Sequence, residues 1–364
     1  MADRKRGPRL RLLLDGTPLL GHRTGIGRYT AALAEELASV ETVSVKAVAF
    51  TLRGWKALRA ALPHGVGARG LPVPARLLRA CWLRSPLPPV ELFAGMSNIV
   101  HGTNFVLPPS LRAAGVVTIH DLAFLDSPDD LPPSDRRLPD LVRRSAKRAA
   151  MVCTPTKAVA KQVVERLDVP MERVAVTPLG VDAAWFAARP PNDALRQRLG
   201  LPSQYLLFVG ADGPRKGLPT LLEAHGARPD LPPLVLAGPG PRSEHDRITR
   251  TGYLSDVDLR SVVAGASALV MPSRDEGFGL PVLEALACGV PVVCSDVPAL
   301  REVAGGHARL VPVGDSEALG VALAEALSGG GRTETLAARR QYASGFSWHH
   351  CAETTIEAYR KALS

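Results

Sequence analysis

The sequence lacks any apolar run long enough to cross a bilayer. Its apolar runs, such as Ala268 to Met271 and Val290 to Cys294, are far shorter than the roughly 20 residues that a membrane-spanning helix requires. The first ten residues are basic, but only Leu12 to Leu14 follow them before Asp15 interrupts, so no signal-peptide core is present. We therefore expect a cytoplasmic protein without a transmembrane helix.

The sequence also lacks a cysteine framework and a nucleic-acid motif. Its five cysteines include no CxxC pair, and Cys153, Cys288 and Cys294 fall within strand or helix patterns, which favours buried, reduced thiols. The net charge of +9 attracts anions of many kinds and selects no single partner. Because no zinc-finger spacing accompanies this charge, we expect no binding to nucleic acid.

What is present is a repeated alternation of short apolar runs, polar turns and helical stretches. The apolar content of 46% excludes a disordered chain, and 364 residues favour two domains. The alternation is typical of an α/β protein with parallel sheets covered by helices. The expected strands are Leu10 to Asp15, Val43 to Phe50, Asn98 to His101, Gly115 to His120, Met151 to Thr154 and Val174 to Thr177, then Tyr205 to Gly210, Leu234 to Gly238, Ala268 to Pro272 and Pro291 to Ser295.

Three other segments stand out. Residues 178–182, with the Ala-rich and Pro-rich sequence through Pro191, predict an exposed connection between the two halves. Residues 53–90 contain no acidic residue and carry Trp55 and Trp82; they are either a solvated loop and helix or a surface for membrane headgroups or a bulky acceptor. Residues 348–363 predict a terminal amphipathic helix.

The most specific motif runs from Glu276 to Glu284, directly after an expected strand. Its glycines and Pro281 predict a loop that opens a helix. The backbone N–H groups and the dipole at such a helix end favour phosphate. With Glu284 expected in the first turn of the helix, both carboxylates can accept hydrogen bonds from the hydroxyls of one ligand. The motif therefore suits a ligand that carries both phosphates and polyol rings.

This motif resembles the E-x7-E signature of family 4 glycosyltransferases, and the resemblance covers nearly the whole chain. The supporting segments are Asp15 to Thr17 with Gly25 to Thr30, His101 to Asn104, His120 to Leu122, Phe208 to Gly217 and Phe346 to Trp348, which are similar to motifs of the GDP-mannose-using branch. The resemblance implies a GT-B fold, in which two Rossmann-like domains face a cleft and a C-terminal helix crosses back. It places an acceptor-binding domain at 1–182 with 346–364 and a nucleotide-sugar-binding domain at 183–345.

The resemblance also implies roles for individual residues. Glu284 would hold the ribose hydroxyls, and Glu276 would contact the hydroxyls of the donor sugar. The diphosphate would be neutralised by Arg215 and Lys216, because Ala211 stands where many family members have an arginine. The other implied donor contacts are the glycine loop at Gly25 and Gly27, the backbone at Gly277, Phe278, Gly279 and Leu280, the base-facing Tyr253 and Leu254, and His120 beside the transferred sugar.

The resemblance implies a hexosyltransferase that retains the anomeric configuration. Fixed cations and helix-terminal N–H groups can stabilise a departing diphosphate without a metal, and no DxD-type pair lies in a convincing setting, since Asp129 and Asp130 fall in a Pro-rich loop. We therefore expect no metal and no cofactor. GDP-mannose is the favoured donor, and a UDP- or dTDP-sugar stays open.

Other activities and partners stay open at this level. The same fold can host a sugar-nucleotide epimerase or a non-catalytic sugar-nucleotide-binding protein. A dinucleotide oxidoreductase is less favoured, because the loop at Gly25 and Gly27 lacks the third glycine of G-x-G-x-x-G. The acceptor can be a glycolipid, a polysaccharide precursor or a small natural product. The basic residues at 53–90 and 136–148 suit a lipid phosphate at an anionic membrane surface or an anionic soluble acceptor.

Overall fold

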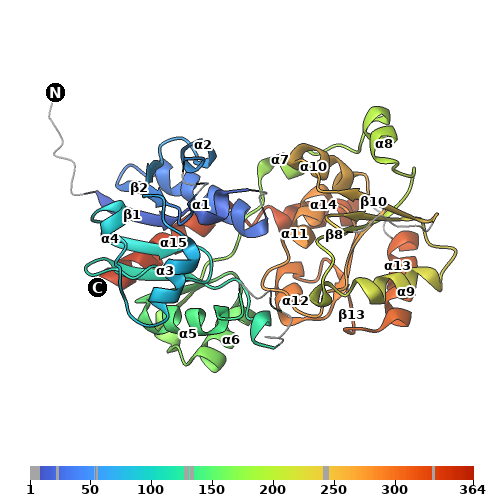
Figure 1. Cartoon of the computed structure of the whole chain (residues 1–364). Helices are drawn as coiled ribbons and strands as arrows, with labels where there is room; N and C mark the ends of the chain where they lie inside the picture. The colour runs from blue at the N-terminus through green and yellow to red at the C-terminus, as the bar shows by residue number, and fades with distance from the viewer. Residues whose placement is uncertain are drawn as a thin grey trace. The chain divides into compact units, whose positions relative to one another are not determined.

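The computed structural model describes residues 9–21, 24–52, 54, 56–126, 131, 135–240, 246–329 and 333–364. The chain divides into two compact units, of which the first comprises Met1–Gly180 with Trp348–Ser364 and the second Val181–Ser347. Each unit contains one sheet covered by helices (Figure 1). Among the described helices, none combines the length and apolarity needed to cross a membrane.

The first unit is built on a seven-stranded sheet in the order β3-β2-β1-β4-β5-β6-β7, with parallel pairing throughout. Because the chain moves outward from β1 in one direction and from β4 in the other, the order reverses between these two neighbours. The carboxyl ends of strands at such a switch point form the usual ligand crevice of α/β sheets. The strands are β1 (Leu10–Asp15), β2 (Val43–Val48), β3 (Gly67–Arg69), β4 (Ile99–Gly102), β5 (Ala114–Thr118), β6 (Met151–Thr154) and β7 (Val174–Val176).

Helices cover this sheet, and the last helix of the chain is one of them. Helix α15 contacts α1 and strands β5, β6 and β7, so it belongs to the first unit although it follows the second in sequence. Its bounds, Trp348–Leu363, are those expected from the sequence. The others are α1 (Gly25–Ser39), α2 (Leu58–Ala61), α3 (Ala75–Trp82), α4 (Glu91–Ala94), α5 (Leu138–Arg148) and α6 (Lys157–Leu167), with short 3-10 turns at Thr17–Leu19, Ala123–Leu125 and Met171–Arg173.

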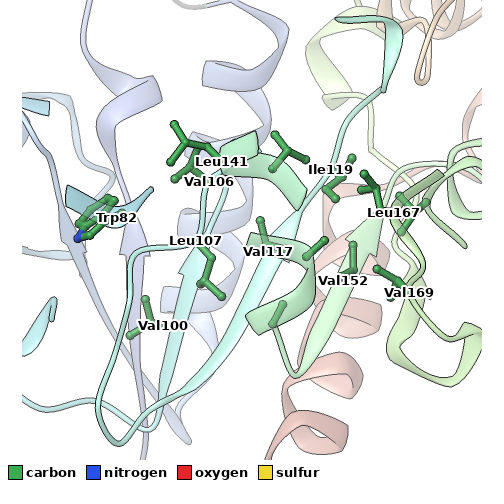
Figure 2. Packing of buried hydrophobic residues seen from close by; sticks show 14 of the residues in the cluster. Trp82, Val100, Val106, Leu107, Val117, Ile119, Leu141, Val152, Leu167 and Val169 are labelled. Carbon is green, nitrogen blue, oxygen red and sulfur yellow. The ribbon is translucent and has the colours of Figure 1, made fainter. Parts of the chain in front are cut away.

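The core of the first unit joins strand residues to α3, α5 and α6 (Figure 2). Trp82 is part of it: only 4% of this side chain is exposed, its ring packs edge-on against Phe50, and its Nε1 donates to the carbonyl of Pro88 at 3.1 Å. Most described residues of 53–90 are not buried, as expected for a solvated loop and helix, but the segment also supplies a strand at the sheet edge and core residues such as Leu78 and Trp82. Trp55, on which that expectation also drew, lies outside the described residues.

The second unit has a six-stranded parallel sheet in the order β10-β9-β8-β11-β12-β13. Its order reverses between β8 and β11, which again defines a switch point. The strands are β8 (Leu206–Val209), β9 (Leu234–Ala237), β10 (Ile248–Gly252), β11 (Ala268–Met271), β12 (Val292–Ser295) and β13 (Arg309–Val311). The helices are α7 (Ala183–Phe186), α8 (Asp193–Leu199), α9 (Leu218–Gly226), α10 (Asp256–Ala264), α11 (Leu280–Cys288), α12 (Pro298–Ala304), α13 (Ser316–Gly329) and α14 (Thr333–Ala343), with a 3-10 turn at Pro214–Lys216.

The structure confirms the expected strands, most of them one or two residues shorter, and adds three. The additions, β3, β10 and β13, are at most five residues long and lie at sheet edges. Half-exposed strands of this length carry too few apolar residues to show a period of two. The connection at residues 178–191, which was expected to be exposed, is only partly exposed, because Leu179, Val181 and Trp185 are buried.

Candidate active site

The switch point of the second unit brings together the two loops that sequence reasoning selected. One loop follows β8 and contains Arg215 and Lys216; the other follows β11 and contains Glu276. Because β8 pairs with β11, both loops leave the same edge of the sheet. The backbone N–H of Arg274 donates to the carbonyl of Arg215 at 2.8 Å, which fastens one loop to the other.

Gly217 allows this close approach. Its φ is 64°, and a Cβ built on it would lie 1.9 Å from the carbonyl oxygen of Pro272. Any residue with a side chain would both strain the backbone and push the loops apart. Glycine is therefore required where the loop after β8 turns into α9.

A polar cluster joins the loops further. The ammonium of Lys216 and the Ser273 hydroxyl both bond to Oε1 of Glu276, at 2.6 Å and 2.7 Å respectively. Ser273 is fully buried, and the side chains of Glu276 and Lys216 are 8% and 22% exposed. Since both bonds end on one oxygen, the second carboxylate oxygen keeps its capacity to accept hydrogen bonds. Lys216, expected to face a diphosphate, thus also neutralises the carboxylate beside it.

The loop after Glu276 ends in the expected helix start. Gly279 is the N-cap of α11 with φ 89°, and Phe278 is buried with its ring centroid 6.1 Å from that of Phe346. In the first turn of α11 the N–H of Leu280 has no helical carbonyl to bond to, Pro281 lacks an N–H, and the N–H of Val282 already donates to the carbonyl of Gly279 at 2.9 Å. The arrangement leaves the Leu280 N–H at the positive end of the helix, next to the loop that carries Glu276.

Glu284 lies elsewhere than expected. It is the fifth residue of α11 and so lies in the second turn, not the first, because the helix begins at Leu280. Its side chain is only 3% exposed. Burial, together with the Glu284 carboxylate one turn earlier, raises the pKa of the Cys288 thiol to about 12.

Tyr253 and Leu254 follow the edge strand β10, two strands away from β8. At the usual spacing between strands this separates them from the β8 loop by roughly 10 Å across the sheet. Tyr253 is half exposed, and Leu254 is buried just before α10. The structure therefore places this pair at the same sheet edge as the other candidates but not in their cluster.

In the first unit, His120 follows β5 close to the switch point. Its Nε2 lies 2.9 Å from the carbonyl oxygen of Thr103, so Nε2 carries the proton and Nδ1 can accept a hydrogen bond. The Thr103 hydroxyl in turn donates to the carbonyl of Asp15 at 2.6 Å, which links the ends of β4 and β1. Burial lowers the pKa of His120, and the neutral form is therefore favoured.

The glycine loop lies near this histidine through the first turns of α1. Helix α1 begins at Gly25, and the Thr24 hydroxyl accepts the N–H of Gly27. Tyr29, one turn into the helix, packs its ring edge-on against His120 with centroids 5.0 Å apart. The structure thus brings Gly25, Gly27 and His120 to the same edge of the first sheet.

Sequence reasoning did not identify the side-chain contacts that hold these groups in place. Ser273 could have been suspected, since it is the first hydroxyl after an entirely apolar strand. A second set is a buried hydrogen-bonded chain from Tyr359 through His101 and Thr118 to Tyr29, with distances of 2.7, 2.8 and 2.8 Å. Burial lowers the pKa of His101 to about 3. Nothing in the local sequence signals this chain, because its members are up to 330 residues apart.

Two parallel sheets, with cations, a helix start and a buried carboxylate at one switch point, are typical of a protein that binds a ligand with phosphates and hydroxyls. Family models agree: "Glycosyl transferase 4-like domain" matches residues 24–180 and "Glycosyl transferases group 1" matches residues 203–329. O-antigen chain mannosyltransferase B of Escherichia coli is 33% identical over 283 residues, covering 72% of this chain and 74% of that protein.

Further similarities support the same family. The D-inositol 3-phosphate glycosyltransferase of Kineococcus radiotolerans is 32% identical and covers 57% of this chain, which spans only 56% of that relative's length. Sucrose-phosphate synthase from Thermosynechococcus elongatus shares the fold with a TM-score of 0.73 at 21% identity, over 97% of this chain and 98% of that one. The chain belongs to the family 4 type of group 1 glycosyltransferases, and it is an enzyme that transfers a sugar. An epimerase or a non-catalytic binding protein is not favoured.

Proposed function

We propose that this glycosyltransferase moves mannose from GDP-mannose to a hydroxyl of its acceptor and retains the anomeric configuration. The cluster of Lys216, Glu276 and Ser273 at the switch point, next to the start of α11, carries the proposal. It offers cations, helix N–H groups and a held carboxylate, which are the partners that a sugar-linked diphosphate needs.

In this proposal each group of the second unit has one task. Arg215, Lys216 and the N–H groups from Gly277 to Leu280 bind the diphosphate and stabilise the charge that builds on it as it leaves. The free oxygen of Glu276 accepts hydrogen bonds from sugar hydroxyls, and Glu284 accepts those of the ribose. Tyr253 and Leu254 face the base. Because fixed cations and backbone donors carry the diphosphate, the enzyme works without a metal or another cofactor.

In the first unit, Nδ1 of neutral His120 accepts a hydrogen bond from a hydroxyl of the transferred sugar. The loop at Gly25 and Gly27 lets the backbone approach the donor closely. The acceptor oxygen attacks the anomeric carbon on the face that the diphosphate leaves. The bond from that carbon to the phosphate oxygen breaks with its electron pair, and the acceptor proton passes to the departing phosphate. The nucleotide diphosphate and the mannosylated acceptor are the products.

Mannose is favoured because the similar Escherichia coli protein is named a mannosyltransferase. The acceptor is a glycolipid, a polysaccharide precursor or a small natural product at the cytoplasmic side. If it is lipid-linked, we expect the segment 53–90 to meet the anionic membrane surface, since it lacks acidic residues and exposes Leu71, Leu77 and Leu87.

The test offers GDP-mannose, UDP-glucose and a dTDP-sugar with octyl α-mannoside as the acceptor probe, with and without a chelator. We expect GDP release and an α-linked product from GDP-mannose alone, unchanged by the chelator. Glu276→Gln should lower kcat/KM by about ten- to hundredfold, the value of a hydrogen bond to a charged group. Release of nucleotide from UDP-glucose alone, a chelator-sensitive rate or a β-linked product would each contradict the corresponding part of the proposal.

A further inference from the structure

A groove of about 510 Å³ lies in the first unit, away from the residues discussed so far. It is lined by Leu83, at the end of α3, and by Arg137, Asp140, Arg143 and Arg144 of α5 and its N-cap. An ion pair at 3.8 Å between Arg79 and Asp135 ties α3 to the residues that precede α5. Helices α3 and α5, which are labelled in Figure 1, thus lie beside a hollow whose lining holds three arginines and one aspartate.

Within the part of the chain that the structure describes, the charged side chains that line this groove carry a net positive charge. Three guanidinium groups face one carboxylate, and Asp140 is engaged with Arg143 at 3.8 Å. Among the described residues, Arg137 and Arg144 form no ion pair. The charge of Arg144, together with burial, lowers the pKa of neighbouring Arg148, so these guanidinium groups repel one another.

Helix α5 keeps this charge against its own stability. Arg137 is the N-cap, where the helix dipole favours acids and disfavours cations. Arg143 with Lys147, and Arg144 with Arg148, are like-charged pairs one turn apart, which destabilise a helix. Arg148 is compensated by a hydrogen bond to the carbonyl of Leu107 and Arg143 by its ion pair with Asp140, so the unfavourable placement concerns Arg137 and Arg144, and such departures from local rules are expected at functional sites.

The chemistry of the residues that line the groove indicates which class of ligand it can bind. Guanidinium groups present planar forks that match phosphate oxygens, and several of them together suit a group with more than one negative charge. Leu83 adds an apolar wall beside the charge. Because α5 follows the loop after β5, its N-terminal end lies at the same sheet edge as His120.

We propose that this groove binds the phosphate group of a phosphorylated ligand. Binding of the anion does not depend on the proposed function; only the further statement that this ligand is the sugar acceptor rests on it. The phosphate can belong to a soluble sugar phosphate or diphosphate or to a lipid headgroup, and these share the chemistry that the arginines recognise.

The first experiment measures binding of inorganic pyrophosphate to the full chain by calorimetry at constant ionic strength. Saturating GDP is present to fill the donor site, and its own binding is measured separately, so that failure of the donor proposal is seen independently. The groove variant is Arg143→Gln with Arg144→Gln. The control is Arg360→Gln with Lys361→Gln, which removes the same charge from exposed positions in the last turn of α15.

We expect the groove variant to bind pyrophosphate at least about tenfold more weakly than the wild type, the value of losing one charged contact of ordinary strength. The control variant should bind within about twofold of the wild type. Equal dissociation constants for groove and control variants, or no binding of pyrophosphate by the wild type, would overturn the proposal.

The second experiment distinguishes the source of the phosphate. Co-sedimentation is measured with phosphatidylcholine vesicles that contain phosphatidic acid, and pyrophosphate is added as a competitor. Binding that pyrophosphate displaces and that the groove variant loses assigns a lipid phosphate. Binding of pyrophosphate in solution without vesicle binding assigns a soluble phosphorylated ligand. Vesicle binding that both variants lose equally, without a difference in pyrophosphate affinity, contradicts a site at this groove.

Discussion

Replacement of Gly217 by alanine tests whether the two loops at the switch point of the second unit must touch. A methyl group here would lie 1.9 Å from the carbonyl oxygen of Pro272, whereas real Cβ atoms essentially never approach closer than 3.0 Å. The loop after β8 must therefore move by about 1 Å away from the loop that carries Glu276, since close-packed interiors leave no room to absorb the clash.

Gly200 provides the matched control. It has the same φ of 64°, but a Cβ built on it meets nothing within 4 Å. Gly200→Ala should cost only the strain of a left-handed alanine, roughly 1–2 kcal/mol. Gly217→Ala should add about 1–3 kcal/mol for the steric overlap. The difference is measured as the free energy of unfolding in urea.

The effect on activity should separate the two variants more sharply. A displacement of about 1 Å at a catalytic site can cost on the order of a hundredfold in rate, so we expect that loss of sugar transfer in Gly217→Ala and a change within about twofold in Gly200→Ala. Equal losses of stability and activity in both variants would refute the reasoning, because the backbone strain would then account for everything and the contact with Pro272 for nothing.

Three further predictions concern the buried polar groups. Ser273→Ala should lower the free energy of unfolding by about 1.5–3 kcal/mol, because it removes a buried hydrogen bond to the Glu276 carboxylate, and it should also reduce kcat/KM. The control is Ser295→Ala, at the buried end of β12. An equal effect of both substitutions in urea unfolding would contradict a role for the bond. Lys216→Met and Glu276→Gln should each leave the partner residue unpaired, so a double-mutant cycle in unfolding free energy should give a coupling of about 1–3 kcal/mol. Additive losses would show that the ion pair contributes nothing to stability. Burial lowers the pKa of His101 from 6.5 to about 3, so between these two pH values a proton binds this histidine in the unfolded chain only. The free energy of unfolding should therefore be highest above pH 6.5 and fall by roughly 1.4 kcal/mol per pH unit below it, with a smaller slope in His101→Gln. Identical slopes of the two proteins from pH 7 to pH 4 would show that His101 is not the cause.

The amino-acid sequence by itself determined most of the helices and strands of this protein and the residue types in the two loops of its candidate site. Apolar runs bounded by turns predicted the interior strands, and the helical period predicted α15 to the residue. The glycines and Pro281 predicted a loop that opens a helix at the end of β11. These features are local, since a strand, a turn or a helix start is encoded by residues next to one another in the chain.

The short edge strands were not predicted, because the prediction relied on local patterns that such short segments do not show. β3 and β13 are three residues long, which is too short for a period of two to appear. Glu284 lies in the second turn of α11 and not the first, because the helix begins at Leu280. Helix boundaries depend on dihedral angles that the sequence pattern defines only to within a residue or two.

Only the tertiary structure decided which side chains meet. Lys216 and Ser273 converge on one oxygen of Glu276 because β8 and β11 are neighbours in the sheet, although 60 residues separate the lysine from the glutamate. Tyr359 reaches His101 because α15 packs on the first sheet. The order of strands in a sheet follows from how the whole chain buries its apolar faces, and that is a property of the folded molecule rather than of any segment.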